Sequence, residues 1–454
     1  MITTTIHLSD ILNSQRIDVA YYKDNLGTND FVSLSKYVDI KGGKRIPKDK
    51  SFSFEDTNYL YLRLSDITDF ENINYSALKN IDEELFNTLK RYEICNNEIV
   101  FSIAGTIGRV FVVRNIPKGK RVILTENCAK LLPKNDNILP EYISLLLNCD
   151  FVHKQIEQNR IQTTIPKIGL DRIAKLKVPE LPSFNVQQEI AELYQKAQTL
   201  RLKKEQEAKQ ILHDIDNYIL EALGINKHHN EPCEAQLRKV SSLIGERLDV
   251  TFHKSIENVT TAIKKIAYMS LGEIAEMSSE GWDQKSLFTD VFPYVEISAI
   301  DIVGGVINNI DYMSIDKVPS RAKKIVRKND ILISTTRPNR GAICIYDEEY
   351  ISIASTGFSI VRHINNCVLR EYLYLILRSS LSLEQMAIRS SGGNYPAITE
   401  TELKRILVPI PSLDVQKDIV DTVFGMKAKA TELQKTGAYI LEKIKQKIER
   451  LILK

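Results

Sequence analysis

Two long stretches of the chain carry apolar or small residues at spacings of three and four, a pattern that predicts amphipathic helices. They follow Asn185 and Asp414, which are good helix N-caps, and Gly224 suits the end of the first. Each helix should run for about 39 residues, or about 58 Å. The narrow stripe is typical of a coiled-coil seam. Its members are Ile190, Leu193, Ala197, Leu200, Ala208, Ile211, Ile215, Tyr218 and Ala222, then Ile419, Val423, Met426, Ala430, Leu433, Ile440, Ile444, Ile448 and Leu451.

A single helix with so narrow a stripe would not bury enough apolar surface to be stable alone. Two arrangements would cover the stripe. The helices either pair antiparallel within the chain or associate with helices of another copy. We favour the pair within the chain, because the second helix is available at no cost in translational entropy.

A mixed region precedes each helix, with short β-branched and aromatic runs that predict strands. The first copy has "NYLYLRLSDI" from Asn58 and "EIVFSI" from Glu98, and the second has "FPYVEISAI" from Phe292 and "DILIST" from Asp330. Short helical patterns begin at Pro140 and Arg370, and Pro-rich segments lead into the long helices. Each region is therefore expected to form a mixed α/β domain.

The order of elements shows that the chain is written twice. The segment "IPKIGLDRIAKLKVPELPSFNVQQEIAEL" from Ile165 recurs as "YPAITETELKRILVPIPSLDVQKDIVDTV" from Tyr395, with Gln187 opposite Gln416. Two similar units in one chain can form a pseudo-two-fold object, and DNA is a common ligand with two-fold symmetry.

The predicted fold class is α+β, with two similar mixed α/β domains joined by two long antiparallel coiled-coil helices in a pseudo-two-fold arrangement. The first domain is placed at residues 1–177 and the first helical spacer with a polar linker at 178–235. The second domain is placed at 236–407 and the second spacer at 408–454.

Composition narrows the class of protein. A chain of 454 residues with 43% hydrophobic and 26% charged residues is typical of a soluble, multi-domain globular protein. The net charge of only +3 weakens a nucleic-acid interpretation based on bulk charge, though local patches can still bind. Six separately placed cysteines indicate reduced thiols in a cytoplasmic protein. The sequence predicts no signal peptide and no contact with a membrane.

The sequence shows no catalytic constellation. It has no glycine-rich phosphate loop followed by Lys-Ser/Thr, no dinucleotide fingerprint and no His-x-x-x-His pair on a helix. We therefore expect a binding protein with no catalytic residues, no metal site and no cofactor of its own.

Polar, glycine-rich loops at matched places in the two copies carry the candidate DNA contacts. Backbone N–H groups in such turns approach phosphates, and arginine can read guanine or hold a phosphate. For any single residue an ordinary solvated hairpin is the better interpretation, whereas the matched set favours binding. The side chains differ between copies, which predicts two different half-sites. The candidates are Lys41, Gly43, Lys44, Arg45, Thr106 and Arg109 in the first copy, and Trp282, Gln284, Lys285, Thr335, Thr336, Arg337, Asn339, Arg340, Asn394 and Tyr395 in the second.

Over nearly its whole length the chain resembles the specificity subunits of type I restriction–modification systems. The resemblance is carried by the exits "VPELPSFNVQQEIAEL" from Val178 and "VPIPSLDVQKDIVDTV" from Val408, by "SIAGTIGRV" from Ser102 and by "KGGKRIP" from Lys41. The second copy departs from the Gly-x-x-Gly turn with "TRPNRG".

This resemblance implies a noncatalytic subunit that reads a bipartite, asymmetric DNA sequence with one domain per half-site. It also implies two methyltransferase (modification) subunits that bring S-adenosylmethionine, and ATP-driven restriction or translocase subunits. Three alternatives stay open: a recognition subunit of a methylation-only system, a coiled-coil scaffold that binds protein, and a single-chain methyltransferase or nuclease with unrecognised motifs.

Overall fold

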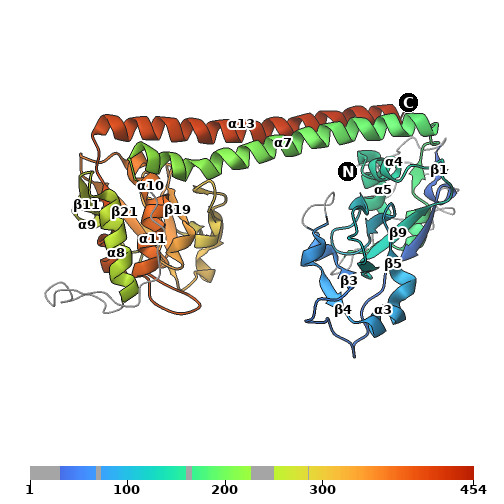
Figure 1. Ribbon diagram of the computed structural model, residues 1–454, viewed down its shortest axis with the longest axis horizontal. Helices are drawn as coiled ribbons and strands as arrows, with labels where there is room; N and C mark the ends of the chain where they lie inside the picture. Colours follow the sequence, from blue (N-terminus) through green and yellow to red (C-terminus); the bar gives the residue numbers. More distant parts are fainter. Residues whose placement is uncertain (1–30, 68–72, 160–165, 226–249, 285, 454) are drawn as a thin grey trace. The chain divides into compact units, whose positions relative to one another are not determined.

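The computed structural model describes residues 31–67, 73–159, 166–225, 250–284 and 286–453. The chain forms two compact units (Figure 1). The first unit consists of Met1–Lys203 with Thr436–Lys454, and the second of Lys204–Lys435. Each unit therefore contains one mixed α/β part and a segment of both long helices.

The first unit contains two four-stranded sheets, in the orders β2-β9-β6-β7 and β4-β3-β8-β5. The first sheet is antiparallel throughout, whereas β3 and β8 run parallel in the second. A short antiparallel pair of strands, β1 with β10, joins the segment that enters the domain to the segment that leaves it. The strands are β1 (Val32–Ser33), β2 (Val38–Gly42), β3 (Tyr59–Leu62), β4 (Lys79–Ile81), β5 (Glu93–Ile94), β6 (Ile99–Ser102), β7 (Val110–Val112), β8 (Arg121–Leu124), β9 (Cys128–Pro133) and β10 (Lys177–Val178).

The second unit repeats this topology strand for strand. Its sheets have the orders β12-β21-β18-β19 and β16-β13-β20-β17, with β13 and β20 parallel. The pair β11 with β22 matches β1 with β10, and the hairpin β14–β15 is an addition. The strands are β11 (Tyr268–Ser270), β12 (Ala275–Met277), β13 (Val291–Val295), β14 (Ile300–Asp301), β15 (Val306–Ile307), β16 (Asp311–Ser314), β17 (Ala322–Val326), β18 (Ile331–Ser334), β19 (Ile343–Ile345), β20 (Ser352–Ser355), β21 (Phe358–Ile364) and β22 (Leu407–Pro409).

Alternation along the central strands explains the layers of each domain. Successive side chains of a strand point to opposite faces. In β6, Ile99 and Phe101 pack toward helices α4 (Pro140–Leu147) and α5 (Asp150–Asn159), while Val100 packs between the two sheets. In β18, Ile331 and Ile333 face helices α10 (Arg370–Arg378) and α11 (Ser380–Arg389), while Leu332 lies between the sheets.

The outer face of the second sheet is covered differently in the two units. In the first unit α3 (Glu83–Leu89) supplies the cover through Leu85, Phe86 and Leu89. In the second unit Trp282 packs there against Phe292. The shorter α-helices of the two units also include α6 (Leu170–Ala174), α8 (Val250–Ile263), α9 (Leu271–Ile274) and α12 (Glu400–Lys404).

The two predicted long helices are α7 (Phe184–Ala222) and α13 (Leu413–Ile452). They begin at Phe184 and Leu413, so the predicted N-caps Asn185 and Asp414 lie inside the first turn. The carbonyls of Ser183 and Ser412 already accept from the backbone N–H groups of Gln187 and Gln416. The predicted stop at Gly224 is confirmed. Its φ is +64°, and the N–H of Ile225 bonds back to the Leu220 carbonyl, as in a glycine-terminated helix.

Pairing of the two helices within the chain is confirmed inside each unit. In the first, Ile190 near the start of α7 shares a core with Ile448 near the end of α13. In the second, Leu220 near the end of α7 shares a core with Ile419 near the start of α13. The segments therefore run antiparallel. Three seam assignments are wrong, because Leu200, Ala222 and Leu451 are exposed. For the last two, the next residue along the chain, Leu223 or Ile452, is buried instead.

Matched buried glutamines join each spacer helix to its own domain. The Gln187 amide accepts from Leu139 N at 2.9 Å and donates to the carbonyls of Asn137 and Pro182. Gln416 makes the same bonds with Leu369, Cys367 and Pro411. Because such groups are costly to leave unpaired when buried, these glutamines fix the exit angle of both helices.

Carboxylates on the long helices also cap a domain helix in each unit. Glu449 of α13 accepts from the Phe151 N–H at the start of α5, at 3.1 Å. Asp216 of α7 accepts from the Ser380 N–H at the start of α11, at 2.7 Å. Acceptors at a helix N-terminus satisfy donors that have no partner within the helix. In each unit the acid comes from the spacer helix of the other copy.

The thiols of Cys95, Cys128, Cys149, Cys344 and Cys367 are free, and Cys233 lies outside the described residues. Of the helices that the structure describes, none has the length and apolarity needed to cross a membrane. The predicted linker falls almost wholly outside the described residues, which resume at Val250.

Candidate nucleic-acid interface

The glycine-rich turn of the first unit connects β6 with β7 and is held by one buried hydroxyl. Ser102 Oγ donates to the Thr106 carbonyl at 2.5 Å and accepts from the Arg109 N–H at 2.9 Å. Gly105 has a φ of +75°, in the left-handed region that favours glycine. The closed turn leaves Thr106 and Arg109 exposed.

A second loop of the first unit, residues 41–45, lies beside this turn and near the start of β9. The N–H of Gly43 donates to the Cys128 carbonyl, while the N–H of Ile103 donates to that of Asn127. A Cβ at Gly43 would lie 2.0 Å from the Thr125 carbonyl oxygen, so only glycine fits there.

The side chains of this second loop differ in availability. Lys41 and Lys44 are exposed. Arg45 is exposed too, but its guanidinium is paired with the Glu126 carboxylate at 2.5 Å. The structure thus brings the first copy's candidates to one region, with Arg45 already holding a partner.

The matching turn of the second unit is braced by the same backbone scheme. In the first unit Gly105 N donates to Pro166 O and Ile168 N to Ile103 O. In the second, Arg337 N donates to Pro396 O and Ile398 N to Thr335 O. The turn continues into a short 3-10 helix, η8 (Pro338–Arg340). Two loops that lie about 60 residues apart in the sequence are therefore neighbours.

Three candidates of the second unit meet at this junction. The Arg337 guanidinium donates through Nη2 to the Asn394 carbonyl at 2.9 Å and lies 4.3 Å from the ring centroid of Tyr395. Tyr395 is 71% exposed, and Asn339 and Arg340 are exposed on the same turn. The sequence supplied these residues as separate candidates, and only the fold shows that they touch.

Other candidates of the second unit serve the scaffold. Trp282 was expected to contact DNA, but it is only 4% exposed and its indole N–H donates to Ser286 O at 2.7 Å, so it is a core residue. Gln284 is half-buried with a φ of +65°. Thr335 bonds to the Gly357 carbonyl, and Thr336 is half-buried in a bridge with Ala397. Lys285 lies outside the described residues.

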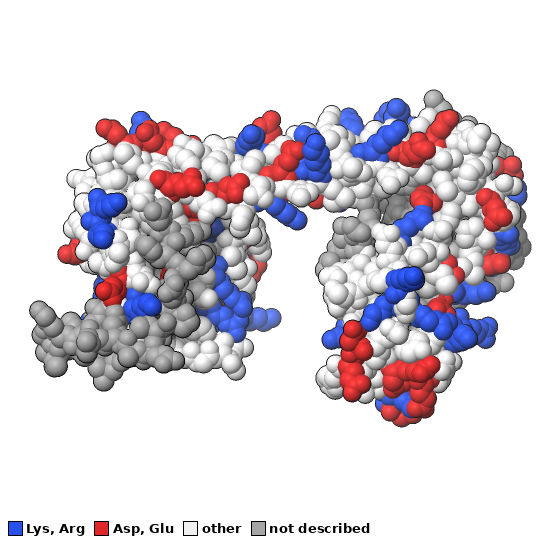
Figure 2. Space-filling model, viewed as in Figure 1, with Lys and Arg blue, Asp and Glu red and all other residues white. Residues whose placement is uncertain are grey.

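Charge is distributed in patches. In Figure 2 lysine and arginine side chains gather at several places on each unit, with acidic side chains between them. This distribution agrees with the small net charge of +3 and with binding through local groups.

A matched ion pair lies at the start of the central strand of each unit, β6 or β18, at the end away from the turn. Lys130 pairs with Glu98 in the first unit, and Arg362 pairs with Asp330 in the second, at 2.8 Å. Each cation also donates to a backbone carbonyl at the corresponding position, that of Glu93 or Ile325. Sequence reasoning missed these pairs, although the repeat aligns "NEIVFS" with "NDILIS".

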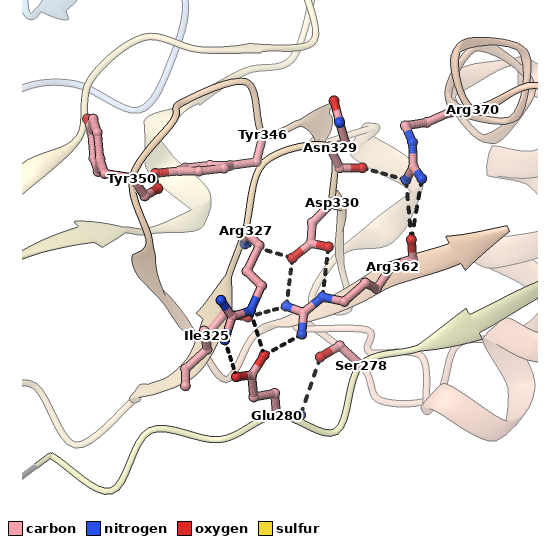
Figure 3. Close-up of polar contacts among 10 residues, drawn as sticks. All are labelled: Ser278, Glu280, Ile325, Arg327, Asn329, Asp330, Tyr346, Tyr350, Arg362 and Arg370. Carbon is pink, nitrogen blue, oxygen red and sulfur yellow. Dashed lines mark hydrogen bonds and ion pairs between the residues drawn. The ribbon is translucent and has the colours of Figure 1, made fainter. Parts of the chain in front are cut away.

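The pair of the second unit extends into a network (Figure 3). Glu280 bonds to both Arg327 and Arg362, while Arg370 donates to the Asn329 carbonyl. The Arg327 guanidinium, followed by that of Arg362, lowers the pKa of Glu280 to about 2, against the opposing effect of desolvation. The network fixes the start of β18 against β21, at the end of the strand away from the turn that holds Arg337.

Comparison with known proteins agrees with this duplicated architecture. The family model "Type I restriction modification DNA specificity domain" matches twice, at residues 28–213 and 263–446. The specificity subunit of the type I restriction enzyme HindI from Haemophilus influenzae is 29% identical over 180 residues, which cover 39% of this chain and 38% of that subunit. The MjaVIII specificity subunit from Methanocaldococcus jannaschii is 24% identical over 380 residues, which cover 81% and 80%.

A solved structure shares the fold. It comes from work on complex assembly and conformational transition of the type I R-M system, and the match has a TM-score of 0.54 at 15% identity. It covers 93% of this chain and 96% of that one.

Proposed function

Because the chain belongs to the type I restriction–modification DNA specificity family, we propose that it is the DNA-recognition subunit of a type I restriction–modification complex. The observation that carries this proposal is the repeated scaffold with unequal loops. Gly105 and Arg337 occupy the same place in the same hydrogen-bond scheme, yet one presents no side chain and the other a guanidinium. Equal scaffolds with different donors suit two different half-sites of one target.

In this proposal the first unit binds one half-site and the second unit the other. The target is then bipartite and asymmetric. The two long helices set the number of base pairs between the half-sites and dock the partner subunits. The same buried glutamine contacts join each helix to its own domain. Partner subunits that dock on the helices would therefore be connected to both domains in the same way.

The chain itself is proposed to be noncatalytic and cytoplasmic. Two methyltransferase subunits would supply S-adenosylmethionine and methylate the target, and restriction or translocase subunits would use ATP. Family membership supports this division of labour. A recognition subunit serving a methylation-only system would use the same loops and the same helices.

The isolated chain is expected to bind duplex DNA weakly, and its methyltransferase subunits are expected to tighten binding and confer sequence preference. The reason is the small net charge, which leaves affinity to a few local contacts. Fluorescence anisotropy at several salt concentrations, with and without the partners, measures this effect.

Two results would contradict the proposal. Methylation of DNA by the isolated chain with adenosylmethionine would show that the chain is itself an enzyme. DNA affinity that does not fall with salt, in the full complex, would favour a protein-binding scaffold instead.

A further inference from the structure

We propose that Arg337 reads a guanine in the half-site bound by the second unit, and that Tyr395 is a positioning residue that holds its guanidinium. This inference rests on the proposed function and adds to it one residue, one base and the means of orientation. Three features of the molecule support it: the backbone of the turn, the contacts of the guanidinium and the contrast with the first unit.

The backbone at Arg337 is in a conformation that side chains other than glycine seldom adopt. Its φ and ψ are 49° and 51°, in the left-handed region. The matching position in the first unit is Gly105, with a φ of +75°. The turn therefore tolerates glycine, and an arginine stands there although the backbone disfavours it. A disfavoured conformation that the surrounding structure enforces is a mark of functional sites.

The side chain of Arg337 is held as firmly as its backbone. The N–H donates to Pro396 O at 2.7 Å, and Nη2 donates to Asn394 O at 2.9 Å. The guanidinium lies over the Tyr395 ring, which supports its plane by a cation–π contact. Among the residues that the structure describes, no hydrogen-bond partner is found for Nε or Nη1. The guanidinium of Arg337 therefore keeps N–H groups that can donate to a ligand.

A guanine fits this arrangement better than a phosphate does. The O6 and N7 atoms of guanine accept two parallel hydrogen bonds from one guanidinium in the major groove. That bidentate contact requires a fixed plane, whereas a phosphate contact requires little more than a positive charge within reach. Arg340, exposed on the same turn, has no orienting side-chain contact among the described residues and suits a phosphate.

The first unit has no arginine at the matching position, which is Gly105. A Cβ built on Gly105 would meet no atom within 4 Å, so the place of the arginine side chain is open. Guanine recognition through this position should therefore be confined to the half-site of the second unit.

The test compares Arg337→Gln and Arg337→Lys with the control Arg340→Gln, each in the full chain assembled with its methyltransferase subunits. Methylated motifs are mapped in cells, and competition binding is measured against duplexes altered at single positions. We expect the Arg337 variants to lose discrimination at one G·C pair of one half-site, by roughly five- to 150-fold, which corresponds to about 1–3 kcal/mol. Arg337→Gln should also gain adenine at that position, because glutamine pairs with adenine.

Tyr395 gives an independent test that leaves the arginine in place. Tyr395→Leu should lower discrimination at the same base pair, because the guanidinium loses its platform, whereas Tyr395→Phe should retain it. Arg340→Gln should weaken binding to all sequences alike and relax no position.

The inference is overturned if the second half-site contains no G·C pair, if the Arg337 variants weaken all sequences equally, or if Tyr395→Leu leaves discrimination at that pair intact. The first two results would make Arg337 at most a phosphate contact. These failures are distinct from failure of the proposed function, in which the unaltered chain would produce no methylated motif at all.

Discussion

Replacing Arg362 by methionine is expected to destabilise the second unit by about 3 kcal/mol, at the low end of the range for breaking a buried ion pair. The Asp330 side chain is only 2% exposed and accepts from Arg362 at two of its oxygens. Without the arginine, a buried carboxylate remains with no charged partner. Amide hydrogen exchange should show the loss in β18 and β21, with β6 and β9 of the first unit unchanged.

Two variants make this expectation specific. Arg362→Lys should cost less, because lysine makes the matching pair in the first unit through Lys130. Arg327→Met should cost at most about 1 kcal/mol, because the Arg327 side chain is 45% exposed and exposed pairs contribute little. An Arg362→Met chain as stable as the unaltered one would show that the pair is not a support of the scaffold.

The pH dependence of the same network has a definite sign. The pKa of Glu280 is lowered from 4.5 to about 2 in the folded chain. Its contribution to stability is therefore present above about pH 4.5 and is lost as the pH falls toward about 2. In Arg362→Met this acid-sensitive contribution should shrink, since one of the two guanidinium groups that lower the pKa is gone.

Lengthening both spacer helices together by four residues is expected to change the spacing of the methylated target and leave its half-sites unchanged. The insertions are placed after Lys203 and after Lys435, at the boundaries between the two units, so the contacts inside each unit are untouched. Four residues add about 6 Å of helix, which approaches two base pairs at about 3.4 Å each. They also rotate the following residues by only about 40° beyond one full turn.

A matched pair of two-residue insertions serves as the control. Two residues rotate the apolar stripe by about 200°, so the seam faces away from its partner and activity should fall much further. Mapping of methylated motifs distinguishes the variants. Half-site bases that change while the spacing stays constant would show that the helices do not set the spacing.

The duplication explains how much of the fold the sequence could predict. The matched exits and the three-four spacing predicted the two domains and both long helices, with helix ends accurate to within two residues. Periodicity predicted the seam less accurately, because Leu200 and Leu451 are exposed and the buried residue at the end of the second helix is Ile452. A narrow stripe on a long helix leaves such small rotations undetermined.

The candidate site was predicted in its parts but not in its assembly. Arg337 and Tyr395 were both selected from polar loops, yet no local signal indicates that one ring supports the other guanidinium. Trp282 shows the opposite limit. A tryptophan beside charged residues is predicted to lie at the surface. Only the folded chain shows that Trp282 covers the sheet face that helix α3 covers in the first unit. The ion pairs were missed because each joins strands that are neighbours only in the folded chain.

The most direct test of one domain per half-site is motif mapping for variants altered in a single unit. The complex would be assembled with the unaltered chain, with Lys44→Ala combined with Arg109→Ala, and with Arg337→Ala. Methylated motifs would then be mapped genome-wide in the same host. We predict a bipartite motif for the unaltered chain, with relaxation confined to one half-site in the first variant and to the other half-site in the second. Relaxation of both half-sites by either variant would contradict the assignment of one half-site to each domain.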